Sequence, residues 1–258
     1  MITRSHQNPR PTVAFGPGAR AFTIVETLLV VAVAGALVTI AFAASRHAVV
    51  AGQQAKCAGN LRQLGAALNL YANENDGWLP GTTHELGVEY EKAWVFALKP
   101  YLASCDRVRI CPADPKGRER LDANGTSYIL NSYVFVPQVG PFGESLGTSL
   151  NNVRRISQPS RTLFAANISD RQGVSVQSDH THSERWGGND LPDQRVSGNW
   201  DALCADIQPD RFTTRPRADH TNGSANYLFA DGHVENIAAS EVKRRLIEGD
   251  NIARPPDL

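Results

Sequence analysis

The chain has 258 residues, and its 26 basic and 26 acidic side chains give a formal net charge of zero at pH 7. This balance excludes the strongly basic surface that is typical of proteins that bind nucleic acid. The length is sufficient for one globular domain with a core of ordinary size, together with shorter accessory segments.

The most informative segment lies near the N-terminus. Residues 27–44 form an uncharged, apolar run of eighteen residues. At a rise of about 1.5 Å per residue, a helix of this length is just long enough to cross the hydrocarbon of a bilayer. Glu26 stands at the head of the run. A carboxylate costs roughly 2.5 to 3.5 kcal/mol at the bilayer centre, so we expect Glu26 to lie at the interface or to meet a cation there.

The residues around Glu26 resemble a known processing signal. The string AFTIVE at residues 21–26, behind a basic leader, resembles the class III prepilin signal of type IV pilins and type II secretion pseudopilins. In that family a prepilin peptidase cuts before the apolar run and methylates the new N-terminal Phe, and the Glu pairs with the terminal amine of a neighbouring subunit. The resemblance implies cleavage between Ala21 and Phe22, N-methylation of Phe22 and an assembly role for Glu26. The family usually has Gly at the position of Ala21.

The same resemblance implies a division into a cleaved leader (1–21), a transmembrane and assembly helix (22–44) and an exported globular domain (45–258). The leader contains three Arg and no acid, so the mature chain would have 23 basic and 26 acidic residues and a net charge of −3. The expected location is the inner (cytoplasmic) membrane, crossed once, with the domain on the periplasmic side. The expected partners are prepilin peptidase and other pilin or pseudopilin subunits.

Two other interpretations of the N-terminus remain open. A secretory signal peptide would have its positive region at Arg4, Arg10 and Arg20, its apolar region at Thr27–Ile40 and an A-x-A cleavage site at residues 41–43. It would release a soluble exported protein. A plain signal anchor would keep the helix in the membrane. Neither interpretation assigns a role to Glu26, so we favour the prepilin signal.

A helical pattern continues beyond the apolar run. Apolar side chains recur at spacings of three, four or seven residues, at Val50, Cys57, Leu61, Leu64, Leu68 and Tyr71. The pattern predicts one helix from Thr23 to about Asn73, ended by the string NENDG. Its amphipathic part, residues 45–75, is expected to lie on the globular domain.

Further motifs extend the resemblance over most of the chain. They are similar to those of a large group of prepilin-like proteins from planctomycete-type and verrucomicrobia-type bacteria. The matching segments are residues 57–68, 71–80, 94–102, 111–115 and 127–131. The resemblance implies a pilin-like α+β fold, in which a long N-terminal helix packs on an antiparallel sheet.

The apolar pattern changes period after residue 127. Tyr128–Val136 and Arg161–Ile168 are predicted strands. Residues 225–230 and 233–237 flank Asp231-Gly232, which predicts a β-hairpin with a type I′ turn. Beyond it, Ser240 is the expected N-cap of a short terminal helix, residues 241–248.

The hairpin also resembles the C-terminal signature of that group, a His followed by nine residues and then Asp-Gly. The corresponding residues are His220, Asn226, Asp231, Gly232 and His233, with ten residues between His220 and Asp231. We expect these residues to cap and order the hairpin rather than to catalyse a reaction or to bind a metal.

A polar stretch without clear periodicity, residues 169–219, is predicted to be a long insertion. His180, His182 and Glu184 alternate along it and are weak candidates for transition-metal ligands, although a solvated loop is favoured. Calcium candidates without a supporting spacing are Asp190, Asp193, Asp201 and Asp206. No cofactor is expected. The sequence lacks the common hydrolase, metalloprotease and phosphate-loop motifs, so an enzyme is not expected either.

Four cysteines in an exported protein form a candidate disulfide set. Cys57 and Cys111 lie in segments that match the resemblance, whereas Cys105 and Cys204 do not. On that basis we expect Cys57 to pair with Cys111, and Cys105 with Cys204. A Cys105–Cys111 bridge is possible if the chain between them turns back, since six extended residues span about 20 Å and a disulfide tolerates about 4.4 to 6.8 Å between Cα atoms.

The expected function is structural: a pseudopilin or minor pilin that polymerises through its N-terminal helix in a type II secretion or type IV pilus system. The alternative is a monomeric, membrane-anchored binding protein that uses the prepilin signal only for targeting and residues 169–219 for recognition. The sequence does not distinguish these two functions.

Overall fold

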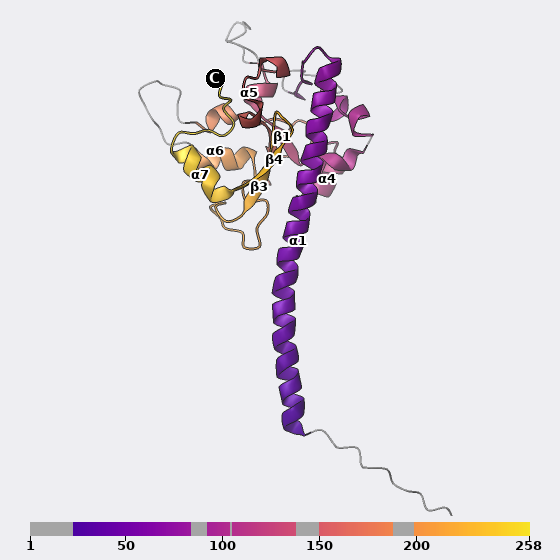
Figure 1. Ribbon diagram of the computed structural model, residues 1–258, viewed down its shortest axis with the longest axis vertical. Helices are drawn as coiled ribbons and strands as arrows, with labels where there is room; N and C mark the ends of the chain where they lie inside the picture. Colours follow the sequence, from indigo (N-terminus) through magenta and orange to yellow (C-terminus); the bar gives the residue numbers. More distant parts are fainter. Residues whose placement is uncertain (1–22, 84–91, 104, 138–149, 188–198) are drawn as a thin grey trace, which may run out of the picture. The chain divides into compact units, whose positions relative to one another are not determined.

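The structure is a computed structural model that describes residues 23–83, 92–103, 105–137, 150–187 and 199–258. Its contacts divide the chain into two compact units, Met1–Ser45 and Arg46–Leu258. The described residues form a long apolar N-terminal helix and a four-stranded antiparallel sheet with short helices around it (Figure 1). The chain therefore has the α+β architecture that the sequence predicts.

The long helix α1 runs over Ile24–Glu74, as predicted from the apolar spacing. It ends where Asp76 and Gly77 adopt positive φ angles of 53° and 89°. The Gly77 N–H donates to the Ala72 carbonyl at 2.7 Å, which is the long-range bond of a Schellman cap. The predicted end of the helix is therefore confirmed, and its cause is the backbone conformation of these two residues.

The two parts of α1 differ in burial. In the first unit the large apolar side chains between Ile24 and Phe42 are exposed. In the second unit the centre of the predicted apolar stripe is buried, with Cys57, Leu61, Leu64 and Leu68 fully enclosed, whereas Val50 and Tyr71 at its ends are partly buried. Among the described residues, α1 is the one helix that is long and apolar enough to cross a membrane.

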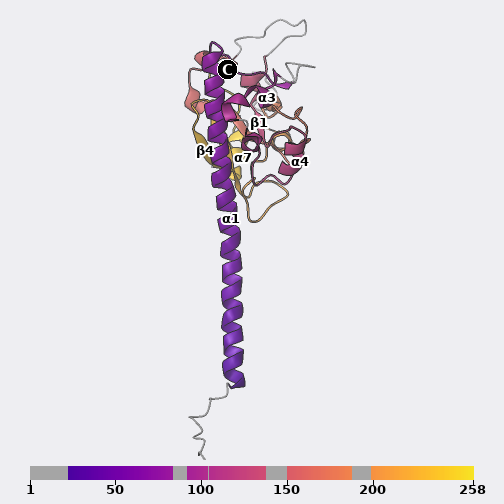
Figure 2. The same cartoon turned by 90° about the vertical axis from the view of Figure 1, so that its right-hand side faces the viewer.

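The sheet has the strand order β1-β2-β3-β4, and all neighbouring strands are antiparallel. The strands are β1 (Tyr128–Leu130), β2 (Leu163–Asn167), β3 (Ser224–Phe229) and β4 (Val234–Ala238). On one face Tyr128 and Leu228 pack in a cluster with the buried stripe of α1, which lies along the sheet in Figure 2. On the other face Ile129 and Tyr227 pack in a second cluster with α6 (Trp200–Asp206) and α7 (Ala239–Ile247).

Shorter helices complete the described chain. They are α3 (Trp94–Ala97), η2 (Pro100–Leu102), η3 (Asp106–Arg109), α4 (Gly117–Asp122), α5 (Ser132–Phe135), η4 (Val153–Arg155), η5 (Pro159–Arg161) and η6 (Ser183–Arg185).

The predicted strand Tyr128–Val136 is only half correct, because β1 ends at Leu130 and α5 follows. The Asn131 side chain accepts a hydrogen bond from the Tyr133 N–H at 3.2 Å and so caps α5. Its amide also donates to the Leu163 carbonyl at 2.9 Å. A short apolar run fits a strand and a helical turn equally well, and this N-cap decides between them.

The hairpin is present, but its turn is not type I′. The Gly232 N–H donates to the Phe229 carbonyl at 2.9 Å, and the Phe229 N–H donates to the His233 carbonyl at 3.0 Å. Gly232 has a φ of 88°, whereas Asp231 is not among the residues with positive φ. These features describe a three-residue loop, a type I turn followed by a left-handed glycine.

Two further predictions need correction. Helix α7 begins at Ala239, with Ala238 at the N-cap and no side-chain cap, rather than after Ser240. The described parts of residues 169–219 are not a structureless polar loop, because they contain η6, α6 and the fully buried Trp186. Residues 188–198 lie outside the described chain.

Candidate functional site

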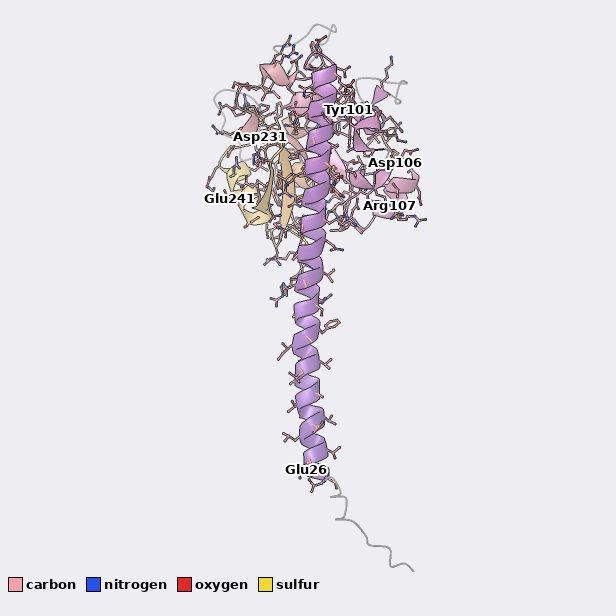
Figure 3. The ribbon with its side chains drawn as sticks, turned by 45° about the vertical axis from the view of Figure 1, so that its right-hand side comes forward. Glu26, Tyr101, Asp106, Arg107, Asp231 and Glu241 are labelled. Atoms are coloured by element: carbon pink, nitrogen blue, oxygen red, sulfur yellow. The ribbon has the colours of Figure 1, made fainter. Side chains whose placement is uncertain are left out.

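The first turn of α1 positions Glu26 through a reciprocal pair of hydrogen bonds. The Thr23 hydroxyl accepts from the Glu26 N–H at 3.2 Å, and Glu26 Oε2 accepts from the Thr23 N–H at 2.8 Å. Oε2 also accepts from the Thr23 hydroxyl at 2.9 Å. This arrangement is a capping box, whose Thr-x-x-Glu signature was available in the sequence. Figure 3 shows Glu26 at the start of the exposed part of α1. Ala21 and Phe22 lie outside the described residues.

The residues of the C-terminal signature form two separate pairs. His220 Nδ1 lies 3.2 Å from Asp210 Oδ1. Asp231 Oδ1 lies 2.6 Å from His233 Nδ1 and accepts from the His233 N–H at 3.0 Å. Burial opposes ionisation of Asp231, but the hydrogen bonds from the His233 backbone and ring outweigh it and lower its pKa. The Asp231–His233 contacts order the hairpin loop, with Asp231 capping the turn, whereas His220 pairs with Asp210 outside the hairpin.

Asn226 of the signature connects the hairpin to α1. Its amide nitrogen donates to the Gln54 carbonyl at 2.9 Å, and its amide oxygen accepts from the Asn236 side chain at 2.9 Å. Since Gln54 belongs to α1 and Asn236 to β4, one side chain links three elements. This role is structural.

His180 of the polar stretch is not in a solvated loop, because it and its neighbour Asp179 are buried, whereas the His182 side chain is 48% exposed. Asp179 Oδ1 lies 2.8 Å from His180 Nδ1, and the Asp179 carboxylate accepts from the Thr83 N–H at 2.9 Å. The His180 and His182 ring centroids are 5.3 Å apart. Over the described part of the chain, however, no group of three His, Cys, Asp or Glu side chains could hold a metal ion. Glu184 therefore does not complete a metal site with these two histidines.

The calcium candidates do not form a cluster either, as far as the structure describes them. Asp201 pairs with Arg171 at 2.8 Å. Asp206 is buried and accepts from the Trp186 indole N–H at 2.9 Å and from the His182 N–H at 2.8 Å. Asp190 and Asp193 lie outside the described residues.

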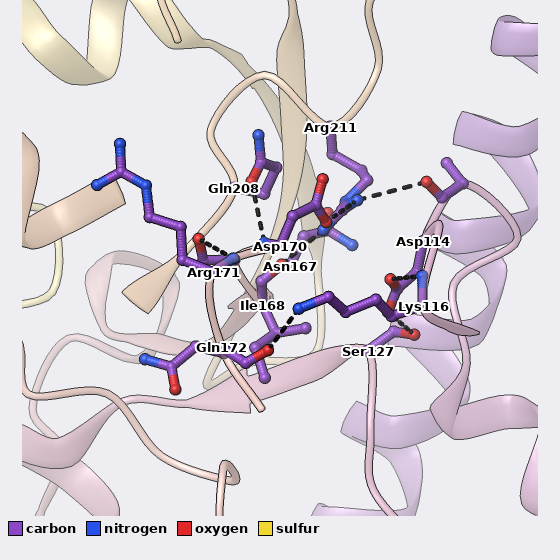
Figure 4. A network of polar contacts seen from close by, with 12 residues as sticks. Asp114, Lys116, Ser127, Asn167, Ile168, Asp170, Arg171, Gln172, Gln208 and Arg211 are labelled. Carbon is purple, nitrogen blue, oxygen red and sulfur yellow. Dashed lines mark hydrogen bonds and ion pairs between the residues drawn. The ribbon is translucent and has the colours of Figure 1, made fainter. Parts of the chain in front are cut away.

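A buried ion pair involves Asp114, which lies in the segment 111–115 of the sequence resemblance. Arg120 Nε lies 3.0 Å from Asp114 Oδ2, and both side chains are 0% exposed. The same carboxylate accepts from the Ser127 hydroxyl at 2.6 Å and from the Lys116 N–H at 2.9 Å (Figure 4). The Arg120 guanidinium donates to the Ser169 carbonyl at 3.1 Å. These hydrogen bonds compensate charges that burial would otherwise make costly.

A second arginine continues this network. Arg211 pairs with Asp170 at 2.7 Å and donates to the Ile168 carbonyl at 2.6 Å. The Lys116 ammonium donates to the Gln172 carbonyl at 3.1 Å, on the other side of the network in Figure 4. Sequence reasoning did not identify Arg120 or Arg211, because nothing in their local sequence indicates a buried partner far along the chain.

Next to this network lie two buried thiols, Cys57 and Cys111, which belong to the first hydrophobic cluster. Cys57 Sγ also accepts from the Tyr128 hydroxyl at 3.4 Å and from the Asn167 amide at 3.3 Å. Burial raises the pKa of a thiol, but for Cys57 the hydrogen bonds from Cys111, Asn167, Tyr128 and Asn226 outweigh burial and lower the pKa to about 7. Its hydrogen bond to Cys57, together with burial, raises the pKa of Cys111.

All four cysteines are free thiols in the structure. The expected partners Cys57 and Cys111 are in contact, but no bond joins them. The expected bond between Cys105 and Cys204 is also not formed, since Cys105 is exposed and Cys204 is buried on α6 in the second cluster. Burial raises the pKa of the Cys204 thiol to about 12.

Two groups of side chains therefore stand out among the described residues. One is Glu26 with its capping partner at the start of an exposed apolar helix. The other is the thiol pair of Cys57 and Cys111 with its hydrogen-bond donors. Comparison of the chain with protein-family models, with curated proteins and with solved structures finds no match.

Proposed function

We propose that this chain is a structural subunit, a pseudopilin or minor pilin, that assembles through its N-terminal helix in a type II secretion or type IV pilus system. Prepilin peptidase would cut between Ala21 and Phe22 and methylate Phe22, leaving the chain in the inner membrane with its domain on the periplasmic side. The observation that supports this proposal most is the ionisable side chain of Glu26 in the first turn of an exposed apolar helix.

The apolar part of α1 must be surrounded by lipid or by other helices, because exposed apolar surface of this extent is unfavourable in water. Within that cover, the Glu26 carboxylate needs a positive partner. Its hydrogen bonds to Thr23 within the described chain all go to Oε2. Oε1 is the oxygen that a cation from outside the chain would meet, and the terminal amine of a neighbouring subunit is such a cation.

The second candidate function is a monomeric anchor for an exported binding protein. The capping box favours it, since it gives Glu26 a role in starting the helix without any partner subunit. The two functions differ in what they require of Glu26. Assembly requires its negative charge, whereas capping requires only an oxygen that accepts a hydrogen bond.

Three substitutions separate charge from capping. Glu26→Gln removes the charge and keeps a capping-box acceptor, Glu26→Ala removes both, and Thr23→Val keeps the charge while it breaks the capping box. If the chain is a subunit, both Glu26 variants are lost from sheared filaments or from the assembled secretion complex, and Thr23→Val co-fractionates like the wild type. The loss follows because an amine without its carboxylate partner is costly in a low-dielectric environment.

The measurement is the recovery of each variant in the assembled fraction, at matched amounts in the membrane. Intact mass shows for each variant that processing before Phe22 has occurred, so failed cleavage is not mistaken for failed assembly. Equal recovery of the wild type and both Glu26 variants would exclude the subunit function. Recovery of Glu26→Gln together with loss of Glu26→Ala and Thr23→Val would assign Glu26 to helix capping alone.

A further inference from the structure

One face of α1 is hydrogen-bonded to residues 110–112 through side chains on both sides of Cys57. Gln53, Cys57 and Asn60 are four and three residues apart and therefore share a helix face. The Gln53 side chain donates to the Pro112 carbonyl at 3.2 Å, and the Asn60 side chain donates to the Ile110 carbonyl at 2.9 Å. The residue between these two carbonyls is Cys111, so the two amides hold it over Cys57.

The surroundings of Cys57 favour a thiolate over a neutral thiol. Cys57 Sγ accepts hydrogen bonds from the Tyr128 hydroxyl at 3.4 Å and from the Asn167 amide at 3.3 Å. Hydrogen bonds to the charged form of a thiol favour that form and make the sulfur a nucleophile. The neighbouring Cys57 sulfur and burial raise the pKa of Cys111, so its thiol stays protonated. The pair thus combines one nucleophilic sulfur with a second sulfur in contact.

We propose that Cys57 and Cys111 are a redox-active dithiol site, which an organic disulfide converts into a disulfide that pins α1 to residues 110–112. The Cys57 thiolate attacks one sulfur of the organic disulfide, forms a mixed disulfide and releases one thiolate. Cys111 then gives up its proton to that thiolate and attacks Cys57 Sγ, which expels the second organic thiolate. The second organic thiolate takes up from solvent the proton that Cys57 released on ionisation, so the organic disulfide is reduced to two thiols and the two cysteines are oxidised.

Both sulfurs are buried, so the exchange requires residues 110–112 to separate briefly from α1. An open hollow of about 550 Å³ lies beside this contact and is lined by Lys56, Ile110 and Pro112. Arg107 and Arg118 also line it, and Asp122, the ion-pair partner of Arg118, is the one acidic residue of the lining. The net positive lining suits an anionic disulfide such as oxidised glutathione. The opening step makes the reaction slower than oxidation of an exposed cysteine such as Cys105.

The experiment incubates the full chain, in detergent, with glutathione buffers of increasing oxidised fraction and then denatures and alkylates it. In Cys105→Ser, which lacks the exposed and faster-reacting thiol, we expect two thiols to disappear together and peptides containing Cys57 and Cys111 to be linked. The wild type should form the same link and should also take up glutathione on Cys105. Cys57→Ser should form no such link. Cys111→Ser should retain a glutathionyl group on Cys57, since the resolving thiol is absent.

A second readout does not depend on the variants folding. Oxidised wild-type protein should melt roughly 5 to 15 °C above the reduced protein, because the bond closes a loop of more than fifty residues in the unfolded chain. Cys57 and Cys111 thiols still open to alkylation after oxidation and denaturation would overturn the proposal. So would a linkage that joins Cys105 or Cys204 in place of the Cys57–Cys111 pair.

Discussion

At the scale of single residues, the Asp114–Arg120 pair shows how this domain places charges in its interior. The carboxylate receives the Ser127 hydroxyl and the Lys116 N–H in addition to the guanidinium. Each charge is thus compensated by more than its partner ion. Removing one partner leaves the other buried and uncompensated, which is more costly than removing both.

We therefore predict that Arg120→Met lowers the free energy of unfolding by about 3 to 5 kcal/mol. The double variant Asp114→Asn/Arg120→Met should be more stable than Arg120→Met alone. The matched control is Arg118→Met on the same helix. Arg118 pairs with Asp122, but their side chains are 86% and 63% exposed, respectively, so this ion pair should contribute nothing measurable to stability. Denaturant unfolding of the four proteins gives the comparison, and equal midpoints for Arg120→Met and Arg118→Met would contradict the prediction.

Contacts between buried polar side chains and distant segments could not be predicted from the sequence. Arg120 and Ser169 are far apart in the chain, and no local pattern indicates that the guanidinium of one reaches the carbonyl of the other. The capping box, by contrast, is visible in the sequence, because Thr23 and Glu26 have its signature spacing of three residues. Partners three residues apart are predictable, whereas partners fifty residues apart are not.

At the scale of elements, the second part of α1 contributes the fully buried centre of its apolar stripe to the first hydrophobic cluster. Leu64 is fully buried in the first cluster, whereas Leu70 on the same helix is 51% exposed. We predict that Leu64→Ala lowers the free energy of unfolding by roughly 2 to 5 kcal/mol, through lost burial and the cavity that remains. Leu70→Ala is the control and should have little effect in the same denaturation experiment. Similar losses for both would mean that the domain does not depend on this stripe.

The elements that the sequence predicted correctly have signals within a few residues. The spacing of apolar residues indicated α1, and the Asp-Gly dipeptide indicated the hairpin. Helix α6 was missed although its signal was present: Asn199 is an N-cap, and Trp200, Leu203, Cys204 and Ile207 follow at helical spacing. The polar residues around it obscured that short pattern. Residues 132–135 were predicted as strand but form a helix, because Asn131 caps that helix. The Asn131 amide also donates to the distant carbonyls of Leu163 and Ala253.

At the scale of the whole molecule, the two units of the chain have different solvent requirements. Residues 24–42 expose their large apolar side chains, whereas the second unit contains both hydrophobic clusters and the buried ion pair. Every stabilising contact described for the sheet, including those of the apolar stripe from Cys57 to Leu68, lies within Arg46–Leu258. The folding of this unit should therefore not depend on the membrane.

We predict that a chain beginning at Arg46 is soluble without detergent and melts cooperatively at the same temperature as the full chain in detergent. The full chain without detergent should aggregate, because a lone helix with apolar side chains on all sides has no cover in water. Circular dichroism and size-exclusion chromatography of both chains provide the measurement. If the shorter chain aggregates or melts without cooperativity, residues 23–45 are part of the folding unit, and the loss of Glu26 variants from an assembled fraction could no longer be attributed to assembly alone.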